Sequence, residues 1–133
     1  MAALILKGRT ISKGLVEGKA LISTKPILFF AYVDPNTGKI MQKDHPLEGK
    51  SILGKILFTP SIRGTVYTWK FYKMVKSGNA PKAIIVEKAD VTLIATTIFS
   101  GIPCLDMLEN NPQEYVKTGN HVKVDATNGF IEI

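Results

Sequence analysis

The sequence predicts an α/β domain whose short strands form a β-rich, barrel-like core with few helices. Three observations lead to this fold class. Many apolar segments are only strand-length and are bounded by glycine or proline. A single stretch has clear helical periodicity, and the C-terminus alternates like a β-hairpin. No linker or low-complexity stretch divides the chain, so we expect one domain over residues 1–133.

The first half of the chain is predicted to be mostly strand. The predicted strands lie at residues 4–6, 20–23, 27–33 and 51–59. Between the last two, Asp34-Pro35-Asn36-Thr37-Gly38 predicts a turn, because proline presets one turn dihedral and glycine accepts positive φ. A loop follows through His45-Pro46, where the residue before proline disfavours helix.

The second half contains the predicted helix, from Val66 to Ser77. Its apolar residues recur with helical period, so its aromatic stripe is expected to be core, and Thr65 is the predicted N-cap. Lys73 and Lys76 suit the negative C-terminal end of the helix. Further strands are predicted at residues 83–86, 102–105, 121–125 and 130–133. Residues 91–99 fit helix and strand equally well.

Composition excludes several classes of protein. The formal net charge of +6 favours an acidic partner or a phosphorylated small molecule, since the basic residues are scattered and form no run typical of nucleic-acid binding. A stand-alone nucleic-acid binder is therefore the least favoured of the functions considered. No apolar run reaches the roughly 18–20 residues of a membrane span. The single cysteine, Cys104, cannot supply the several thiolates of a zinc or iron-sulfur site.

One segment has the residue types of an anion-binding site. Arg63, Gly64 and Thr65 join a predicted strand to the predicted helix, so a guanidinium, a close-approach glycine and a hydroxyl would meet near a helix N-terminus. A simple helix cap explains the same residues equally well. His45 and His121 are isolated and are expected to be structural or exposed, and Cys104 is expected to be a buried hydrophobe.

Several short blocks occur in an order and spacing that resemble a known family. They include Gly8-Arg9, Lys13-Gly14, Val16-Glu17-Gly18, Val33-Asp34-Pro35, His45-Pro46-Leu47, Arg63-Gly64, Ala80-Pro81-Lys82-Ala83, Gly101-Ile102-Pro103 and Thr118-Gly119. Together they span nearly the whole chain and resemble the small subunit of the aconitase X family.

This resemblance implies a swivelling β/β/α domain that acts as a hydro-lyase only with a large subunit. The large subunit would carry the iron-sulfur cluster, and this chain would hold no metal. The implied reaction is the dehydration of a small anionic hydroxy acid in the cytoplasm. The favoured substrate is 5-phosphomevalonate, which would become anhydromevalonate phosphate in an archaeal-type mevalonate pathway. The alternatives are another substrate, such as cis-3-hydroxyproline, or an interaction domain without catalysis. No nucleic acid or membrane is expected as a partner.

The resemblance also implies roles for individual residues. The family has a serine proton acceptor after its Arg/Lys-Gly pair, and Thr65 is the nearest match. A one-residue shortening of this stretch allows Thr68 as the alternative. Arg63 and Gly64 would bind the substrate. Tyr67 and Trp69 depart from the family pattern, which has small residues there, and this leaves an altered substrate or a loss of catalysis open.

Overall fold

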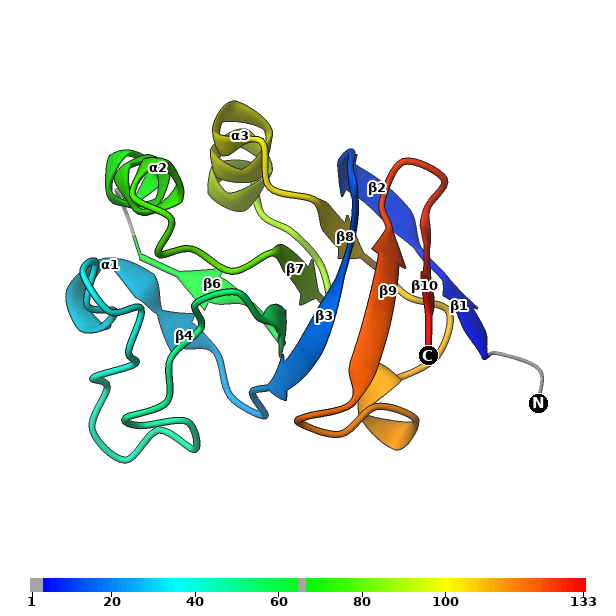
Figure 1. Cartoon of the computed structure of the whole chain (residues 1–133), viewed down its shortest axis with the longest axis horizontal. Coiled ribbons are helices and arrows are strands. Elements are labelled where there is room, and N and C mark those ends of the chain that lie inside the picture. The colour runs from blue at the N-terminus through cyan, green and yellow to red at the C-terminus, as the bar shows by residue number, and fades with distance from the viewer. Residues whose placement is uncertain (1–3, 65–66) are drawn as a thin grey trace.

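The computed structural model describes residues 4–64 and 67–133, and its centre is a strongly curved sheet of eight strands with helices packed outside it (Figure 1). The strands of this sheet are β1 (Ile5–Lys7), β2 (Arg9–Ser12), β3 (Leu15–Ile22), β5 (Ile56–Thr59), β7 (Ala83–Val86), β8 (Cys104–Asp106), β9 (His121–Asp125) and β10 (Phe130–Glu132). The other elements are β4 (Ile27–Leu28), α1 (Phe29–Tyr32), β6 (Ile62–Arg63), α2 (Thr68–Lys76), α3 (Val91–Ser100) and the 3-10 helix η1 (Pro112–Glu114).

Four neighbouring parallel strands, β3, β5, β7 and β8, form the central wall of the sheet. All residues of β5, β7 and β8 are buried, as expected for parallel strands covered on both faces. Their side chains alternate between two cores: Ile56 and Phe58 point into the barrel, whereas Leu57 packs on the helix side. The sheet thus separates a barrel interior from a second core beneath α2 and α3.

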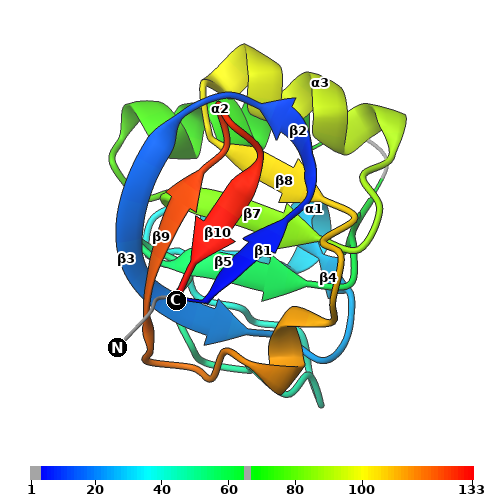
Figure 2. The same ribbon diagram turned by 90° about the vertical axis from the view of Figure 1, so that its right-hand side faces the viewer.

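The first two strands close the sheet into a barrel. β1 pairs with β10, and β2 pairs with β8, so β1 and β2 stand at opposite ends of the strand order. Gly8 alone separates these two strands in the chain. Figure 2 shows the resulting ring, with β1, β9 and β10 on the near side and β5, β7 and β8 behind them. A Cβ atom on Gly8 would lie 2.7 Å from the backbone oxygen of Asp106, so the close approach of these strands requires glycine.

An ion pair between the buried Asp106 and the half-exposed Arg9 secures this closure. The Arg9 guanidinium donates from Nε to Asp106 Oδ1 at 2.9 Å and from a terminal nitrogen to Asp106 Oδ2 at 2.7 Å. Asp106 is fully buried, and its Oδ2 also accepts from the Ala89 backbone amide at 2.7 Å. The Asp106 carboxylate raises the pKa of Arg9, through this hydrogen bond first and its charge second. One carboxylate therefore joins β2, β8 and the approach to α3.

The predicted helix is confirmed, but it begins later than expected. α2 starts at Thr68 with Tyr67 as its N-cap and without a side-chain cap, so the prediction of Thr65 as the cap is wrong. Thr65 itself lies outside the described residues. The core stripe is confirmed for Tyr67, Phe71 and Met74, which are almost completely buried, whereas Trp69 beside them is 58% exposed.

Three predicted strands were wrong in part. Residues 27–33 form only the short strand β4 before turning into α1, since a short apolar run is compatible with either structure. Residues 51–55 form a turn, with Gly54 at a φ of 70°, so only β5 remains of the strand predicted there. β3 is longer than predicted and starts at Leu15, and β2 was missed entirely.

The ambiguous segment at 91–99 is helix α3. Asp90 is its N-cap and accepts from the Leu93 amide at 2.8 Å, while Gly101 ends it at a φ of 72°. The turn predicted at Asp34 to Gly38 is confirmed by the hydrogen bond from the Gly38 amide to the Asp34 carbonyl at 2.8 Å. None of the helices in the described ranges has the length and hydrophobicity needed to cross a bilayer.

Replacing Asp106 with Asn should lower the free energy of unfolding by clearly more than the loss of an exposed ion pair, because the fully buried carboxylate accepts from both Arg9 and the Ala89 amide. Urea titration measures this loss. The matched control is Glu17→Gln, which removes the exposed Glu17–His121 pair at 3.6 Å and should cost less than about 1 kcal/mol. Equal losses in the two variants would contradict the role assigned to Asp106.

Candidate functional site

The carboxyl ends of the four parallel strands meet at one edge of the sheet. There β3, β5, β7 and β8 lead into loops that begin at Ser23, Pro60, Glu87 and Met107 (Figure 2). Backbone hydrogen bonds connect neighbouring loops, from the Glu87 amide to the Pro60 carbonyl at 3.2 Å and from the Met107 amide to the Glu87 carbonyl at 2.9 Å. In open parallel sheets and in parallel barrels alike, ligands bind at the carboxyl ends of the strands, so the candidate site is sought here.

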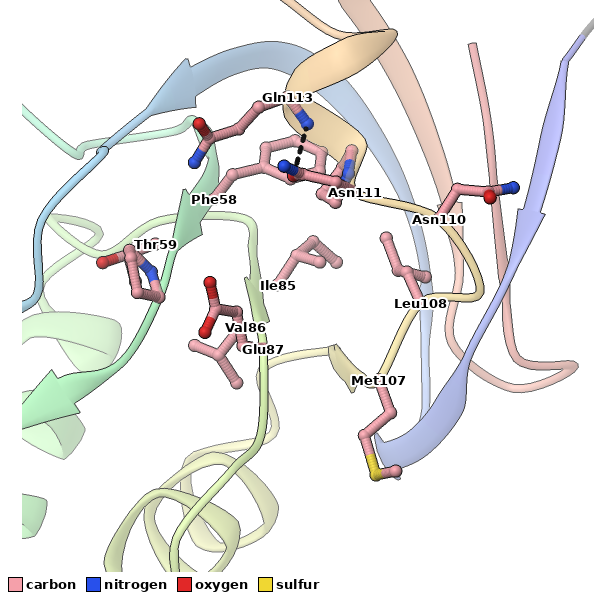
Figure 3. A pocket seen from close by; sticks show the side chains of 12 residues that line it. Phe58, Thr59, Ile85, Val86, Glu87, Met107, Leu108, Asn110, Asn111 and Gln113 are labelled. Atoms are coloured by element: carbon pink, nitrogen blue, oxygen red, sulfur yellow. Dashed lines mark hydrogen bonds between the residues drawn. The ribbon is translucent and has the colours of Figure 1, made fainter.

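A cavity of about 290 Å³ opens at this edge between the ends of β5 and β7 and the loop before η1. Figure 3 shows Phe58, Ile85 and Leu108 among its labelled walls. The polar side chains at its walls are Thr59, Glu87, Asn110, Asn111 and Gln113. Since Glu87 is the charged residue among the described lining residues and no cation accompanies it, the cavity does not suit a phosphate.

The predicted anion-binding residues are not among those that line this cavity, although they follow its lining residue Pro60 in the chain. β6 places Arg63 opposite Leu28 of β4, and the Arg63 side chain is exposed. Within the described residues its guanidinium makes one hydrogen bond, from Nε to Ser61 Oγ at 3.3 Å. Gly64 is also exposed and has a φ of 134°, which favours glycine. Arg63 can therefore present its terminal nitrogens to an anion beside an accessible backbone.

These two residues precede α2 rather than forming its first turn. The helix begins at Thr68, so the positive end of its dipole lies several residues after Gly64 and contributes little to anion binding at Arg63. The segment is nevertheless fixed at both ends, because Ile62 and Tyr67 are buried. Its middle residue, the predicted proton acceptor Thr65, lies outside the described residues and stays a prediction.

The hydroxyl of Thr68, the alternative proton acceptor, is hydrogen-bonded within the protein. Its Oγ1 lies 2.6 Å from Oγ1 of Thr96, which is completely buried on α3. This contact joins the first turn of α2 to the middle of α3. Thr68 thus helps to hold two helices together, and this hydrogen bond occupies part of the bonding capacity of its hydroxyl.

Sequence reasoning did not anticipate a buried polar cluster at the end of β3. Ser23 Oγ lies 3.2 Å from His45 Nε2, which has the appearance of a nucleophile and its base. His45 Nδ1, however, accepts from the Leu47 amide at 3.0 Å, so in the neutral ring the proton is on Nε2. Nε2 then donates to the Lys25 carbonyl or to Ser23 Oγ. The Lys25 carbonyl also accepts from the hydroxyls of Ser23 and Thr59. The cluster holds a loop and does not activate Ser23.

The remaining candidates from the sequence are structural or exposed. His121 is exposed and lies near Glu17, and Cys104 is fully buried. Over residues 4–64 and 67–133, no three His, Cys, Asp or Glu side chains are grouped to hold a metal ion. The described residues therefore do not fit an iron-sulfur cluster or a zinc ion.

The structure brings together residues that the sequence did not single out as a site. The cavity residues Glu87 and Asn110 follow two predicted strands, and their position after strand ends was a usable signal. No sequence signal pointed to the Arg9–Asp106 pair, because its two residues lie 97 positions apart in the chain.

Family, sequence and structure comparisons all find similarity to aconitase X proteins. The family described as the aconitase X swivel domain matches residues 5–133. The phosphomevalonate dehydratase small subunits of Methanosarcina acetivorans and Methanosarcina mazei are 45% and 43% identical to this chain, over 100% of it and 93% of each relative. The crystal structure of Thermococcus kodakaraensis aconitase X in its holo form superposes with a TM-score of 0.90, at 39% identity and over 98% of both chains.

The Cys104 thiol should be unreactive in the native protein near neutral pH. Burial, the main cause, raises its pKa to about 12, and the Asp106 charge adds to the shift, so almost no thiolate forms. An unfolded thiol has a pKa of about 8.5, so the stability that Cys104 contributes is lost as the pH rises above that value. A chromogenic disulfide reagent, with Cys104→Ala as the blank, measures the reactivity. Rapid labelling of the folded chain would contradict this assignment.

Proposed function

This chain belongs to the aconitase X swivel-domain family as a dehydratase small subunit, and we propose that it removes water from 5-phosphomevalonate to give anhydromevalonate phosphate. The observation that carries the proposal is the full-length similarity to relatives named for phosphomevalonate dehydration. The net charge of +6 supports a substrate that carries both a phosphate and a carboxylate.

We assign Arg63 and Gly64 to substrate binding. The exposed guanidinium can form two parallel hydrogen bonds with a carboxylate or a phosphate, and Gly64 lets the backbone approach the same group. Arg63 directly follows the buried Ile62 of β6, which anchors it beside the sheet. The cavity with Glu87 is left to uncharged groups, because its carboxylate repels an anion.

We assign the proton-accepting hydroxyl to Thr65. Thr68 is the weaker candidate, since its hydroxyl is bonded to Thr96. Tyr67 cannot take the role, because burial, the largest cause, raises the pKa of its phenol and keeps it protonated. Threonine keeps the hydroxyl of the family serine, and its added methyl group restricts the χ1 rotamer.

We place the iron-sulfur cluster on a large subunit, because the described residues of this chain offer no group of ligands for it. The carboxyl edge with Arg63 would face that subunit, so that the substrate lies between two chains. Such a complex is expected to work in the cytoplasm.

Thr65→Ala should lower kcat of the complex with its large subunit by about 100-fold or more, since a general base contributes on that order. Thr65→Ser should keep most of the activity. Thr68→Ala should keep kcat within a few fold and cost about 1 kcal/mol of stability from the lost hydrogen bond. Loss of water from 5-phosphomevalonate is followed by product chromatography. Normal kcat in Thr65→Ala with loss in Thr68→Ala would reverse the assignment.

Arg63→Ala should raise KM for 5-phosphomevalonate by about tenfold or more, because a charge-assisted hydrogen bond is lost. Arg63→Lys should recover only part of the affinity, since lysine lacks the planar fork. Steady-state kinetics with mevalonate and cis-3-hydroxyproline as comparison substrates separate phosphate recognition from general binding. Preferred turnover of cis-3-hydroxyproline would show that the substrate is a different hydroxy acid.

A further inference from the structure

An aromatic surface lies on the outer side of α2 and α3, which run beside each other on one side of the sheet (Figure 1). It consists of Trp69, Tyr72, Ile98 and Phe99. The Trp69 and Tyr72 rings are stacked with centroids 5.5 Å apart, and Tyr72 lies 4.9 Å from Phe99. Trp69, Ile98 and Phe99 are 58%, 58% and 59% exposed.

The fold does not require this surface. The core side of the two helices is supplied by other residues, chiefly Phe71, Met74 and Leu93. Contiguous exposed aromatic side chains are unusual on a protein that acts alone, and tryptophan and tyrosine are enriched at the centres of protein interfaces. The stacking also holds the rings in place before any partner arrives, which lowers the entropy cost of binding.

Lysines give the surface a positive charge. The Lys73 ammonium lies 5.4 Å from the centroid of Trp69, and the Lys76 ammonium lies 5.4 Å from that of Tyr72. In the described part of the chain neither lysine forms an ion pair, and neither α2 nor α3 contains Asp or Glu. The matching surface must therefore combine apolar area with carboxylates.

We propose that the aromatic surface docks an acidic, apolar patch on the large subunit of the dehydratase; this inference rests on the function proposed above. A second copy of this chain fits poorly, because a symmetric contact would bring Lys73 and Lys76 against the same basic surface. Trp69 stands in the first turn of α2, shortly after Arg63 and Gly64 in the chain. A subunit that covers the substrate segment can thus extend over Trp69.

The single tryptophan of the chain makes a direct test possible. Labelling with 5-fluorotryptophan gives one fluorine resonance, from Trp69. Adding the unlabelled large subunit should shift this resonance and remove its sensitivity to exchange of H₂O for D₂O. Adding more of the labelled chain alone, or vesicles of anionic phospholipid, should leave the resonance unchanged.

Affinity measurements on the same complex test the contribution of each part. Trp69→Ala and Phe99→Ala should each weaken binding of the large subunit, Trp69→Ala by about 30-fold or more, as for a central interface aromatic. Lys73→Glu with Lys76→Glu should slow association and reverse its salt dependence. The matched controls, Met41→Ala and Lys43→Glu, change exposed residues of another loop and should have little effect.

The outcomes separate this inference from the proposed function. A wild-type complex that dehydrates 5-phosphomevalonate while the fluorine resonance and the Trp69→Ala affinity stay unchanged would overturn the docking surface alone. A concentration-dependent shift without the large subunit would assign the surface to a homodimer, and a shift with vesicles would assign it to a membrane. Absence of any complex with the wild-type chain would overturn the proposed function together with this inference.

Discussion

Closure of the sheet at Gly8 and Arg9 is the constraint on which the rest of the structure depends. The strands on either side of Gly8 pair with opposite ends of the sheet, and glycine alone lets them pass the Asp106 backbone. The Asp106 carboxylate then binds Arg9 and the Ala89 amide, directly before the N-cap of α3. A single buried charge, satisfied by a guanidinium and a backbone donor, therefore links barrel closure to the helix layer.

The closed barrel makes the central strands inaccessible on both faces, and this decides where chemistry can take place. Most side chains of β5 and β7 serve as core, so the groups available for function are those at the carboxyl ends of these strands, such as Thr59, and in the loops that follow. The edge has two electrostatically different parts. The cavity is bordered by Glu87, whereas the loop beyond Pro60 exposes Arg63, and only the latter suits an anion.

The buried polar groups near the carboxyl edge are used for structure. His45, Ser23 and Thr59 hold the Lys25 carbonyl, and Thr68 holds α3. Two exposed features stand out: a guanidinium next to a glycine and a positively charged aromatic surface. Both features require a second molecule to become useful, which agrees with the role of a small subunit.

Local periodicity and turn chemistry were enough to predict the fold class, most of the core stripe of α2, the Asp34 to Gly38 turn and the terminal hairpin. The anion-binding role of Arg63 and Gly64 was also predicted from residue types and order, and it stays a prediction. Tertiary structure alone decided the Arg9–Asp106 pair, the helical state of residues 91–99 and the early end of β4. These depend on contacts between distant segments, and no local pattern encodes which distant neighbour a residue meets.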